Sequence, residues 1–473
     1  MKIKSENNSI KTLGLVITDG VGYRNFILST FLNEAKKEFG HIYIFSGLPK
    51  TAYSDLNKAD ITILELPVFR ENKLNWFFRK LKEVAHLKKH RENPGIADNL
   101  RMNYKSGFSP NALLTKVVYF ISSIFHKEKA ILKYERLQEL SFYRNEKVKF
   151  CQKILEQNKP DILFFTHQRP PFIATLVYLA KKINIPTAAF IFSWDNLASK
   201  GRMAATFDHY LVWSKLMKEE LLRFYPETSV KQVSIVGTPQ FEPYSLSTYN
   251  HDRKWFNDKF ELQSNLKTIC YSCADKSIGP NDPWVIATIA TAIQNEQLEQ
   301  CQLLVRTSPA EEETRFKETK DKFPFIHWNH PKWTQTRLDH PEPWSQRIPE
   351  KEDIAELKAI LQYCDINVNM CSTMSLDFML FDKPVVNTVF GNIKNGRYND
   401  QRFLQYEHYV NVIKSGAVKI ARDEDELITA LKIYLENPDL DSKNRKFLIK
   451  KEIGQDLDKT THCSVRALKE IIE

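Results

Sequence analysis

The stretch INVNMCSTMSLDFMLFDKPVVN, residues 366–387, decides the fold class of this chain. A short strand is expected at 366–369, after which the hydroxyl residues Ser372 and Thr373 open an apolar helix, 375–381. A second strand is expected at 384–389. Strand, turn, helix and strand make a βαβ unit, and repeated units of this kind build a parallel sheet covered by helices.

The same rhythm continues outward from this stretch. We expect further strands at 267–271 and 301–306 in the second half, and at 13–18, 41–45, 61–66, 161–165, 187–192, 209–213 and 233–236 in the first. The predicted fold is α/β, with two doubly wound Rossmann-like domains, 1–245 and 246–455, that face a central cleft. Ligands bind in such a cleft at the carboxyl ends of the strands. Residues 456–473 are expected to form a C-terminal helix that could pack back on the first domain.

The net charge of +10, from 68 Lys and Arg against 58 Asp and Glu, is concentrated in one segment. Residues 71–150 contain 17 Lys and Arg and 8 Asp and Glu, a net of +9, and show no apolar strand. We expect a basic, aromatic-rich helical insertion that binds an anionic membrane surface. A solvated helical subdomain and a self-association surface are the alternatives. Nucleic acid is not expected as a partner, because no recognition motif accompanies the charge.

Cysteine usage and hydropathy bear on the compartment. The seven cysteines show no framework spacing, which favours a reducing environment, and the single C-x-x-C at 270–273 has no second pair at zinc spacing. The polar residues 1–12 contain no apolar signal segment, and the most apolar run, 112–125, is too short to cross a bilayer as a helix. We therefore expect a cytoplasmic protein that can dock on the inner face of the cytoplasmic membrane.

Polar side chains follow three predicted strands of the second half. These candidate donor-binding residues are Ser272, then Arg306 and Ser308, and then Ser372, Thr373, Ser375 and Asp377. Free N–H groups at a helix start, hydroxyl groups and a guanidinium all favour an anion. Together the three strand ends predict a diphosphate site made without glycine, whereas a helix cap at 372–373 is the simpler alternative.

Three predicted strand ends of the first half also carry polar loops. The candidates are Asp19, Arg24 and Asn25, then His167 and Arg169, and then Trp194, Asp195, Asn196 and Lys200. An indole face suits a sugar ring, and amides and carboxylates match its hydroxyl groups. A turn capped by Asp19 and a solvated loop at 166–171 are the alternatives. The turn 20–25 lacks the third small residue of a dinucleotide fingerprint, so no nicotinamide or flavin cofactor is expected.

The pattern Ser372-Thr373-x-Ser375-Leu376-Asp377, with Arg306-x-Ser308-Pro309 upstream, resembles the donor-binding half of GT-B glycosyltransferases. The resemblance is to bacterial surface-polysaccharide enzymes and the CDP-glycerol glycerophosphotransferase-like group, and it spans about 160–455. It implies that Ser272, Arg306, Ser308, Ser372 and Thr373 hold a nucleotide diphosphate, that Asp377 meets the ribose or steadies the loop, and that the first-half loops hold the acceptor. Related sequences often have His-Pro where this chain has Ser308-Pro309. The His-Gly-Asp-Thr signature of the UDP-GlcNAc 2-epimerases, which share the fold, is absent.

The expected chemistry follows from these residues and from that resemblance. No Asp-x-Asp follows a predicted strand, so no metal is expected and protein groups should neutralise the leaving group. Asp19, Asp195 and His167 are the candidates for the base that deprotonates the acceptor hydroxyl. The predicted function is inverting, metal-independent transfer from a nucleotide sugar to a bacterial surface glycan, such as capsule or lipopolysaccharide, or to a lipid-linked glycan. A CDP-glycerol-type polyol-phosphate transferase and a non-catalytic sugar-binding protein are the alternatives.

Overall fold

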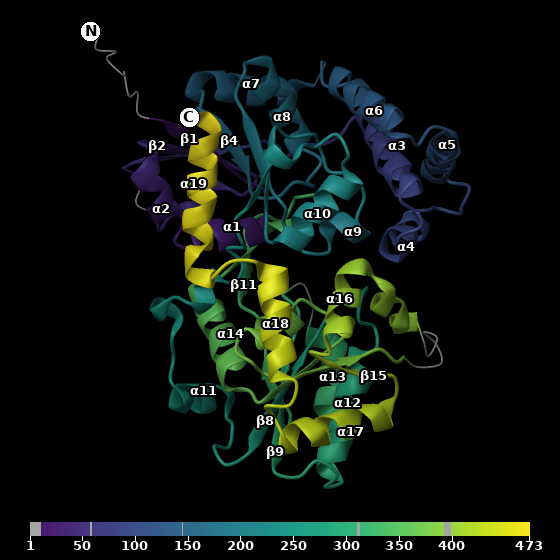
Figure 1. Cartoon of the computed structure of the whole chain (residues 1–473), viewed down its shortest axis with the longest axis vertical. Coiled ribbons are helices and arrows are strands. Elements are labelled where there is room, and N and C mark those ends of the chain that lie inside the picture. The colour runs from purple at the N-terminus through teal and green to yellow at the C-terminus, as the bar shows by residue number, and fades with distance from the viewer. Residues whose placement is uncertain (1–10, 57–58, 144, 310–312, 392–398) are drawn as a thin grey trace.

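The computed structural model describes residues 11–56, 59–143, 145–309, 313–391 and 399–473, which form two stacked α/β halves (Figure 1). The sheet of the first half has seven parallel strands in the order β3-β2-β1-β4-β5-β6-β7. Their bounds are β1 Thr12–Ile17, β2 His41–Ser46, β3 Ile61–Glu65, β4 Ile162–Phe165, β5 Thr187–Phe190, β6 His209–Val212 and β7 Val233–Ile235. The central β1 is apolar and buried along almost its whole length because helices cover both faces of the sheet.

The sheet of the second half has six parallel strands in the order β10-β9-β8-β13-β14-β15. Their bounds are β8 Lys267–Ser272, β9 Cys301–Arg306, β10 His327–Asn329, β13 Ile366–Asn369, β14 Val385–Thr388 and β15 Lys419–Ala421. The βαβ unit predicted from the stretch 366–387 is present as β13, the helix α15 (Met374–Met379) and β14, with β13 and β14 paired in parallel. The prediction of two doubly wound parallel sheets is confirmed.

Helices cover both sheets. In the first half they are α1 Gly20–Ile27, α2 Phe31–Glu38, α8 Ile173–Lys182, α9 Asn196–Ser199 and α10 Lys215–Phe224. In the second half they are α11 Arg253–Phe260, α12 Asp282–Gln294, α13 Lys317–Lys322, α14 Lys351–Tyr363, α16 Glu407–Ser415, α17 Glu424–Glu436 and α18 Ser442–Ile453, together with α15. The last helix, α19 (Thr460–Ile472), returns to the first half and packs against α2 (Figure 1).

The basic segment between β3 and β4 is helical. It contains α3 Lys73–Lys89, α4 Pro94–Met102, α5 Pro110–Ile124, α6 Glu128–Leu140 and α7 Glu146–Asn158. The helix α3 packs against both α5 and α6, and a small core with Leu81, Val118 and Ile131 holds them together. No helix in the described ranges is long and apolar enough to cross a membrane.

A β-hairpin that the sequence did not predict joins the two halves. The strands β11 (Trp333–Gln335) and β12 (Arg347–Pro349) pair antiparallel between β10 and α14, and β12 lies against α1 of the first half. At Gly20 a Cβ would lie 1.5 Å from the carbonyl oxygen of Arg347, so only glycine permits this approach. After β5 the chain forms only the short helix α9, which ends at Ser199.

Candidate functional site

A cavity of about 530 Å³ lies between the carboxyl ends of the two sheets. Residues of both halves line it, and those predicted from the sequence are Arg24, Trp194, Asp195, Ser272, Arg306, Ser308, Ser372, Thr373 and Asp377. We call this cavity the cleft. The cleft brings nine of the predicted residues to one place because parallel strands end at the same edge of each sheet.

The loop after β13 is held by its own side chains. Asn369 Oδ1 accepts the backbone N–H of Ser372 at 2.8 Å, and the Ser372 hydroxyl accepts the N–H of Met374 at 3.2 Å. Cys371 has a φ of +48°, in the left-handed region that few side chains adopt. The N–H groups of Ser372 and Met374, which were expected to be free for an anion, are therefore already hydrogen-bonded. The hydroxyl groups of Ser372 and Thr373 are the polar groups of this loop that line the cleft.

Arg306 is one half of a buried ion pair. Its Nη2 lies 3.0 and 3.1 Å from the two carboxylate oxygens of Asp353, and its Nη1 donates to Asn329. Asp353 was not predicted, because it lies on α14 and follows none of the strands expected from the sequence. Arg306 still lines the cleft, but the free cation expected from the sequence is compensated by a carboxylate.

Ser375 does not line the cleft. It is fully buried, and its hydroxyl is bonded among Asn369, Asn387 and Tyr409 beneath the loop. In this structure the Ser375 hydroxyl is not offered to the cleft, and the residue supports the loop from below; its contact with a donor stays a prediction. A strand-end position could not reveal this, because the partners come from β14 and α16.

Arg24, Tyr244 and Asp377 form a chain across the cleft. Arg24 Nη2 lies 3.4 Å from the Tyr244 hydroxyl, which donates to Asp377 Oδ1 at 2.5 Å. Burial raises the pKa of Asp377 to about 6, although the hydrogen bond from Tyr244 and the charge of Arg24 oppose the shift. Tyr244, which was not among the predicted site residues, thus connects the two halves.

Charged groups in the cleft are mixed in sign. The lining includes the guanidinium groups of Arg24 and Arg306 and four carboxyl groups, those of Asp195, Asp275, Asp353 and Asp377. Among the described residues no group of three or more His, Cys, Asp or Glu is arranged to hold a metal ion. Two of these carboxyl groups, those of Asp275 and Asp353, were not among the residues predicted from the strand ends.

Trp194 is packed between the halves. Only 4% of it is exposed, its Nε1 donates to Thr373 Oγ1 at 3.1 Å, and its ring lies edge-on to His408. The indole therefore does not present the open face expected for a sugar ring. The hydrogen bond instead joins a residue predicted for the acceptor to one predicted for the donor.

Asp195 is surrounded by groups that stabilise its charge. Its carboxylate lies 3.3 Å from Lys200 Nζ and accepts a hydrogen bond from Asn196 at 3.0 Å. Burial alone would raise the pKa of Asp195, but the charges of Lys200 and His408 and the hydrogen bonds hold it well below its usual range. A carboxylate with such a low pKa is a weak base.

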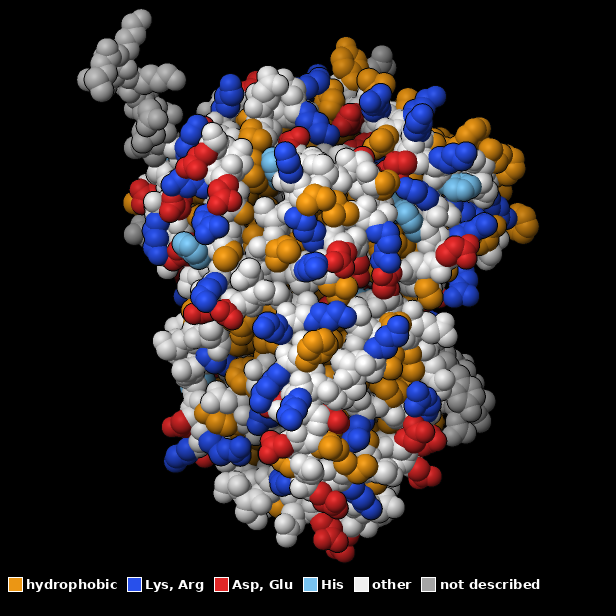
Figure 2. All heavy atoms as spheres, viewed as in Figure 1, with side chains coloured by type: hydrophobic (Ala, Val, Ile, Leu, Met, Phe, Trp, Pro, Cys, Tyr) orange, Lys and Arg blue, Asp and Glu red, His pale blue; other side chains and the backbone are white. Residues whose placement is uncertain are grey.

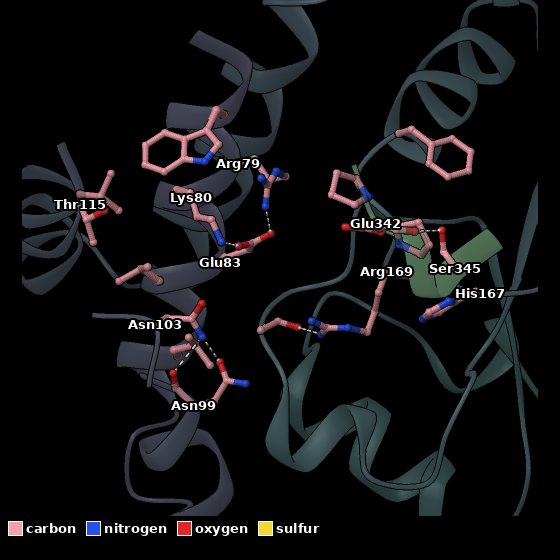
Figure 3. Close-up of a pocket in the computed structure, with 18 of the residues that line it drawn as sticks. Arg79, Lys80, Glu83, Asn99, Asn103, Thr115, His167, Arg169, Glu342 and Ser345 are labelled. Atoms are coloured by element: carbon pink, nitrogen blue, oxygen red, sulfur yellow. Dashed lines mark hydrogen bonds and ion pairs between the residues drawn. The ribbon is translucent and has the colours of Figure 1, made fainter. Parts of the chain in front are cut away.

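A second cavity, of about 510 Å³, is lined by Asp19, just before α1, and by helices of the insertion (Figure 3). We call it the pocket. Figure 3 shows Arg79, Lys80 and Glu83 of α3 on one wall, facing His167 and Arg169 on the other. Further lining comes from α4, α5, the loops that contain Asp19, Pro170 and Gly201, and residues 340–345 of the second half. The α3 side chains were not predicted, because their spacing on an insertion helix gave no sign of a cavity.

Asp19 and His167 form a hydrogen-bonded pair at this pocket. His167 Nδ1 lies 2.9 Å from Asp19 Oδ2, and the imidazole stacks on Phe192 at 3.9 Å between ring centres. Asp19 caps α1 by accepting the N–H of Gly22 at 2.8 Å. Burial would raise the pKa of Asp19, but the hydrogen bond and charge of His167, together with the other donors, lower it below its usual value.

Of three other predicted first-half residues, two line neither cavity and the third lines the pocket. Asn25 is 1% exposed and lines neither the cleft nor the pocket, so nothing in the structure supports its predicted contact with an acceptor. Asn196 likewise lines neither, and its carboxamide is bonded to Gln168 and Asp195. Arg169 lines the pocket and donates to the carbonyl oxygen of Gly201 at 2.8 Å.

No protein-family model matches the sequence, and no curated protein matches it. Solved structures match over nearly its whole length. The chain is similar to S. aureus MnaA solved with UDP, at 10% identity and a TM-score of 0.53, over 98% of this chain and 97% of that one. It is similar to a glycosyltransferase from Rickettsia africae, at 11% identity and a TM-score of 0.51, over 98% of this chain and 99% of that one. It is also similar to the UDP-GlcNAc 2-epimerase from Neisseria meningitidis bound to UDP-GlcNAc, at 10% identity and a TM-score of 0.50, over 98% of this chain and 100% of that one. These likenesses confirm the predicted fold: two Rossmann-like halves in the GT-B arrangement.

Proposed function

We propose that this protein is a glycosyltransferase that uses a nucleotide sugar, with the nucleotide diphosphate in the cleft and the acceptor in the pocket. The observation that carries the proposal is the Asp19–His167 pair, whose 2.9 Å hydrogen bond orients an imidazole at the pocket. Asp19 is the N-cap of α1, and Val21 and Arg24 of the same short helix line the cleft. One rigid element thus places a candidate base next to a candidate donor site.

The pair supplies a base of defined tautomer. Because ionised Asp19 can only accept hydrogen bonds, His167 Nδ1 carries the hydrogen and Nε2 is the basic nitrogen of the neutral ring. Nε2 has no hydrogen-bond partner among the described residues. In the proposed reaction Nε2 takes the proton of the acceptor hydroxyl as its oxygen bonds to the anomeric carbon. The bond from that carbon to the diphosphate breaks with inversion, and Asp19 stabilises the imidazolium.

Cleft residues would stabilise the leaving nucleoside diphosphate. Arg24 and Arg306 supply positive charge, and hydroxyl groups at Ser272, Ser372 and Thr373 supply donors. The four carboxyl groups oppose an anion. Asp377 is the one whose pKa burial raises to about 6, so its charge is the easiest to remove by protonation when a diphosphate enters. In this proposal Arg306 positions the site through Asp353 as well as facing the phosphates.

Similar structures suggest which donors to try first. The S. aureus protein was solved with UDP and the N. meningitidis protein with UDP-GlcNAc. Uridine nucleotides are therefore the first ligands to test for binding. The proposed acceptor is a bacterial surface glycan or a lipid-linked glycan, and the proposed setting is the cytoplasm. The proposed transfer uses no metal: the Asp-x-Asp that follows β15, Asp423-Glu-Asp425, begins α17, and neither aspartate lines the cleft or the pocket.

A thermal-shift screen of nucleoside diphosphates and nucleotide sugars tests the donor site, because a specific ligand stabilises the fold in a concentration-dependent way. The nucleotide sugar that binds is then incubated with acceptor glycans. Release of the nucleoside diphosphate together with a glycosylated product supports the proposal. Release of CMP would instead indicate phosphodiester transfer, and a product with the donor sugar epimerised would indicate an epimerase. The absence of any nucleotide-dependent shift would refute the donor site.

A further inference from the structure

The helix α5 exposes an apolar face to solvent. Its outward residues recur at helical spacing and are Leu113, Val117, Phe120 and Ile124, with Phe108 before the helix and Phe125 after it. Phe120 is 68% exposed and Phe108 is 85% exposed. The opposite face of α5 is buried against α3. A soluble helix normally turns polar residues outward, so this face has an unusual composition.

The cations of the insertion divide into two sets. Four cations of α3 are paired with carboxylates: Arg79 with Glu71 and Glu83, Lys80 with Glu83, Lys82 with Glu135 and Lys89 with Glu128. Exposed Lys105, Lys127 and Lys129, which flank α5 in sequence, make no ion pair with any described residue. The net charge of +9 is therefore carried mainly on the outer surface of the insertion.

Cations and apolar side chains are intermixed on this surface. Lys116 Nζ lies 4.5 Å from the centre of the Phe108 ring, beside the apolar face. Figure 2 shows Lys and Arg among hydrophobic side chains at the edge of the molecule that α5 and α6 occupy in Figure 1. Glu128, which lies between Lys127 and Lys129 in sequence, is bound inward by Lys89 and Arg202 and does not neutralise them.

We propose that the α5 face docks on an anionic lipid bilayer, with its apolar side chains among the upper acyl chains and its lysines among the headgroups. The charge favours lipid over a second copy of this chain, because a two-fold contact through α5 would bring the same unpaired lysines against each other. An anionic surface offers the opposite charge across the whole face.

The inner side of α5 connects this surface to the pocket. Thr115, Val118 and Tyr119 line the pocket, one helix diameter from the outward apolar residues. An acceptor whose lipid tail remains in the bilayer could therefore present its headgroup at the pocket mouth. This last step, a lipid-linked acceptor, rests on the function proposed above, whereas the docking surface itself does not.

Vesicle co-sedimentation tests the docking surface. The wild type should sediment with phosphatidylcholine vesicles that contain phosphatidylglycerol, less with phosphatidylcholine alone, and less again at high salt. The double variant Phe120→Glu, Ile124→Glu should lower the partition coefficient at least about tenfold, because it removes apolar contact and adds negative charge. Phe447→Glu is the matched control: Phe447 is 64% exposed on α18, remote from the insertion, and its loss should leave vesicle binding unchanged.

Three results would overturn the proposal. They are a wild type that stays in the supernatant with anionic vesicles at low salt, a double variant that binds like the wild type, and a dimer that the double variant converts to a monomer without any vesicle binding. Thermal unfolding of each variant checks that the fold is intact.

The nucleotide thermal shift, measured on the same preparations, separates the two proposals. Vesicle binding without a nucleotide shift would refute the donor site alone, and a nucleotide shift without vesicle binding would refute the docking surface alone.

Discussion

Replacing Asp19 by Asn should abolish the basic nitrogen of His167 while leaving the fold intact. The Asn carboxamide oxygen can still accept the N–H of Gly22, which lies 2.8 Å from the present carboxylate, so the cap of α1 survives. Its NH₂ group then faces His167 Nδ1, which lies 2.9 Å from the present Oδ2. To accept that hydrogen bond, the neutral ring must move its own hydrogen to Nε2. The nitrogen that faces the pocket becomes a donor and can no longer take a proton.

The expected loss is that of a general base. Such a group contributes about 10²–10⁴ to the rate, so Asp19→Asn should lower kcat by that factor, or raise the barrier by about 3–5 kcal/mol. His167→Gln should lose a similar amount. Because the two residues act as one unit, the double variant should be little worse than either single variant.

The assay is release of nucleoside diphosphate from the nucleotide sugar found in the thermal-shift screen, with acceptor present. The nucleotide-induced shift should be unchanged in all three variants, since neither residue lines the cleft. Asp195→Asn is the comparison, because Asp195 was the rival base and its pKa is held low by Lys200; its kcat should stay within about tenfold of the wild type. Near wild-type turnover in Asp19→Asn and His167→Gln, with a large loss in Asp195→Asn, would refute the reasoning and move the base to the cleft.

Three further predictions concern the contact between the halves. Thr373→Val should lower the free energy of unfolding by about 1–3 kcal/mol, seen as a lower Tm, because buried Trp194 Nε1 loses its acceptor, whereas Thr373→Ser should retain it. Gly20→Ala should lower Tm by forcing apart α1 and β12, while Gly107→Ala, with nothing within 4 Å of the added Cβ, should not. Because burial raises the pKa of Asp377 to about 6, its contribution to stability is complete below its ordinary pKa near 4 and is lost as the pH rises through about 6. The free energy of unfolding of Asp377→Asn relative to that of the wild type should therefore rise by about 3 kcal/mol across that window, seen as a growing difference in Tm. A difference that does not change with pH would contradict the raised pKa.

Most of the fold could be predicted from the sequence because its strands are buried on both faces. A continuous apolar run such as 13–17, or the unit that starts at 366, is visible without tertiary information. The strands β10, β11, β12 and β15 were missed because each has only three residues and at least one polar side chain among them that breaks the apolar run; β7 is equally short but was predicted, because Val233, Ile235 and Val236 are apolar. Segments of that length have no period to detect, and their pairing depends on neighbours far along the chain.

The candidate site was predicted in position but not in its partners. Strand ends placed Arg306, Trp194 and Asp19 correctly at the edges of the two sheets, since topology alone decides this. What each side chain does there depends on residues that only the fold brings close. Asp353 comes from α14 and compensates Arg306, whereas His167 follows a different strand from Asp19 and completes the pair.

The basic insertion has a mechanical consequence because it touches both halves. Tyr406 of the second half donates to Asp98 of α4 at 2.5 Å, and Asn93, which caps α4, donates to Glu407 at 2.6 Å. On the other side of the molecule β12 lies against α1. A nucleotide that enters the cleft by a relative motion of the halves must break these polar contacts or carry the insertion with the second half. Either change reshapes the pocket, whose walls are α3, α4 and α5 on one side and the loops at Asp19 on the other, so occupancy of the cleft and the shape of the pocket are physically coupled.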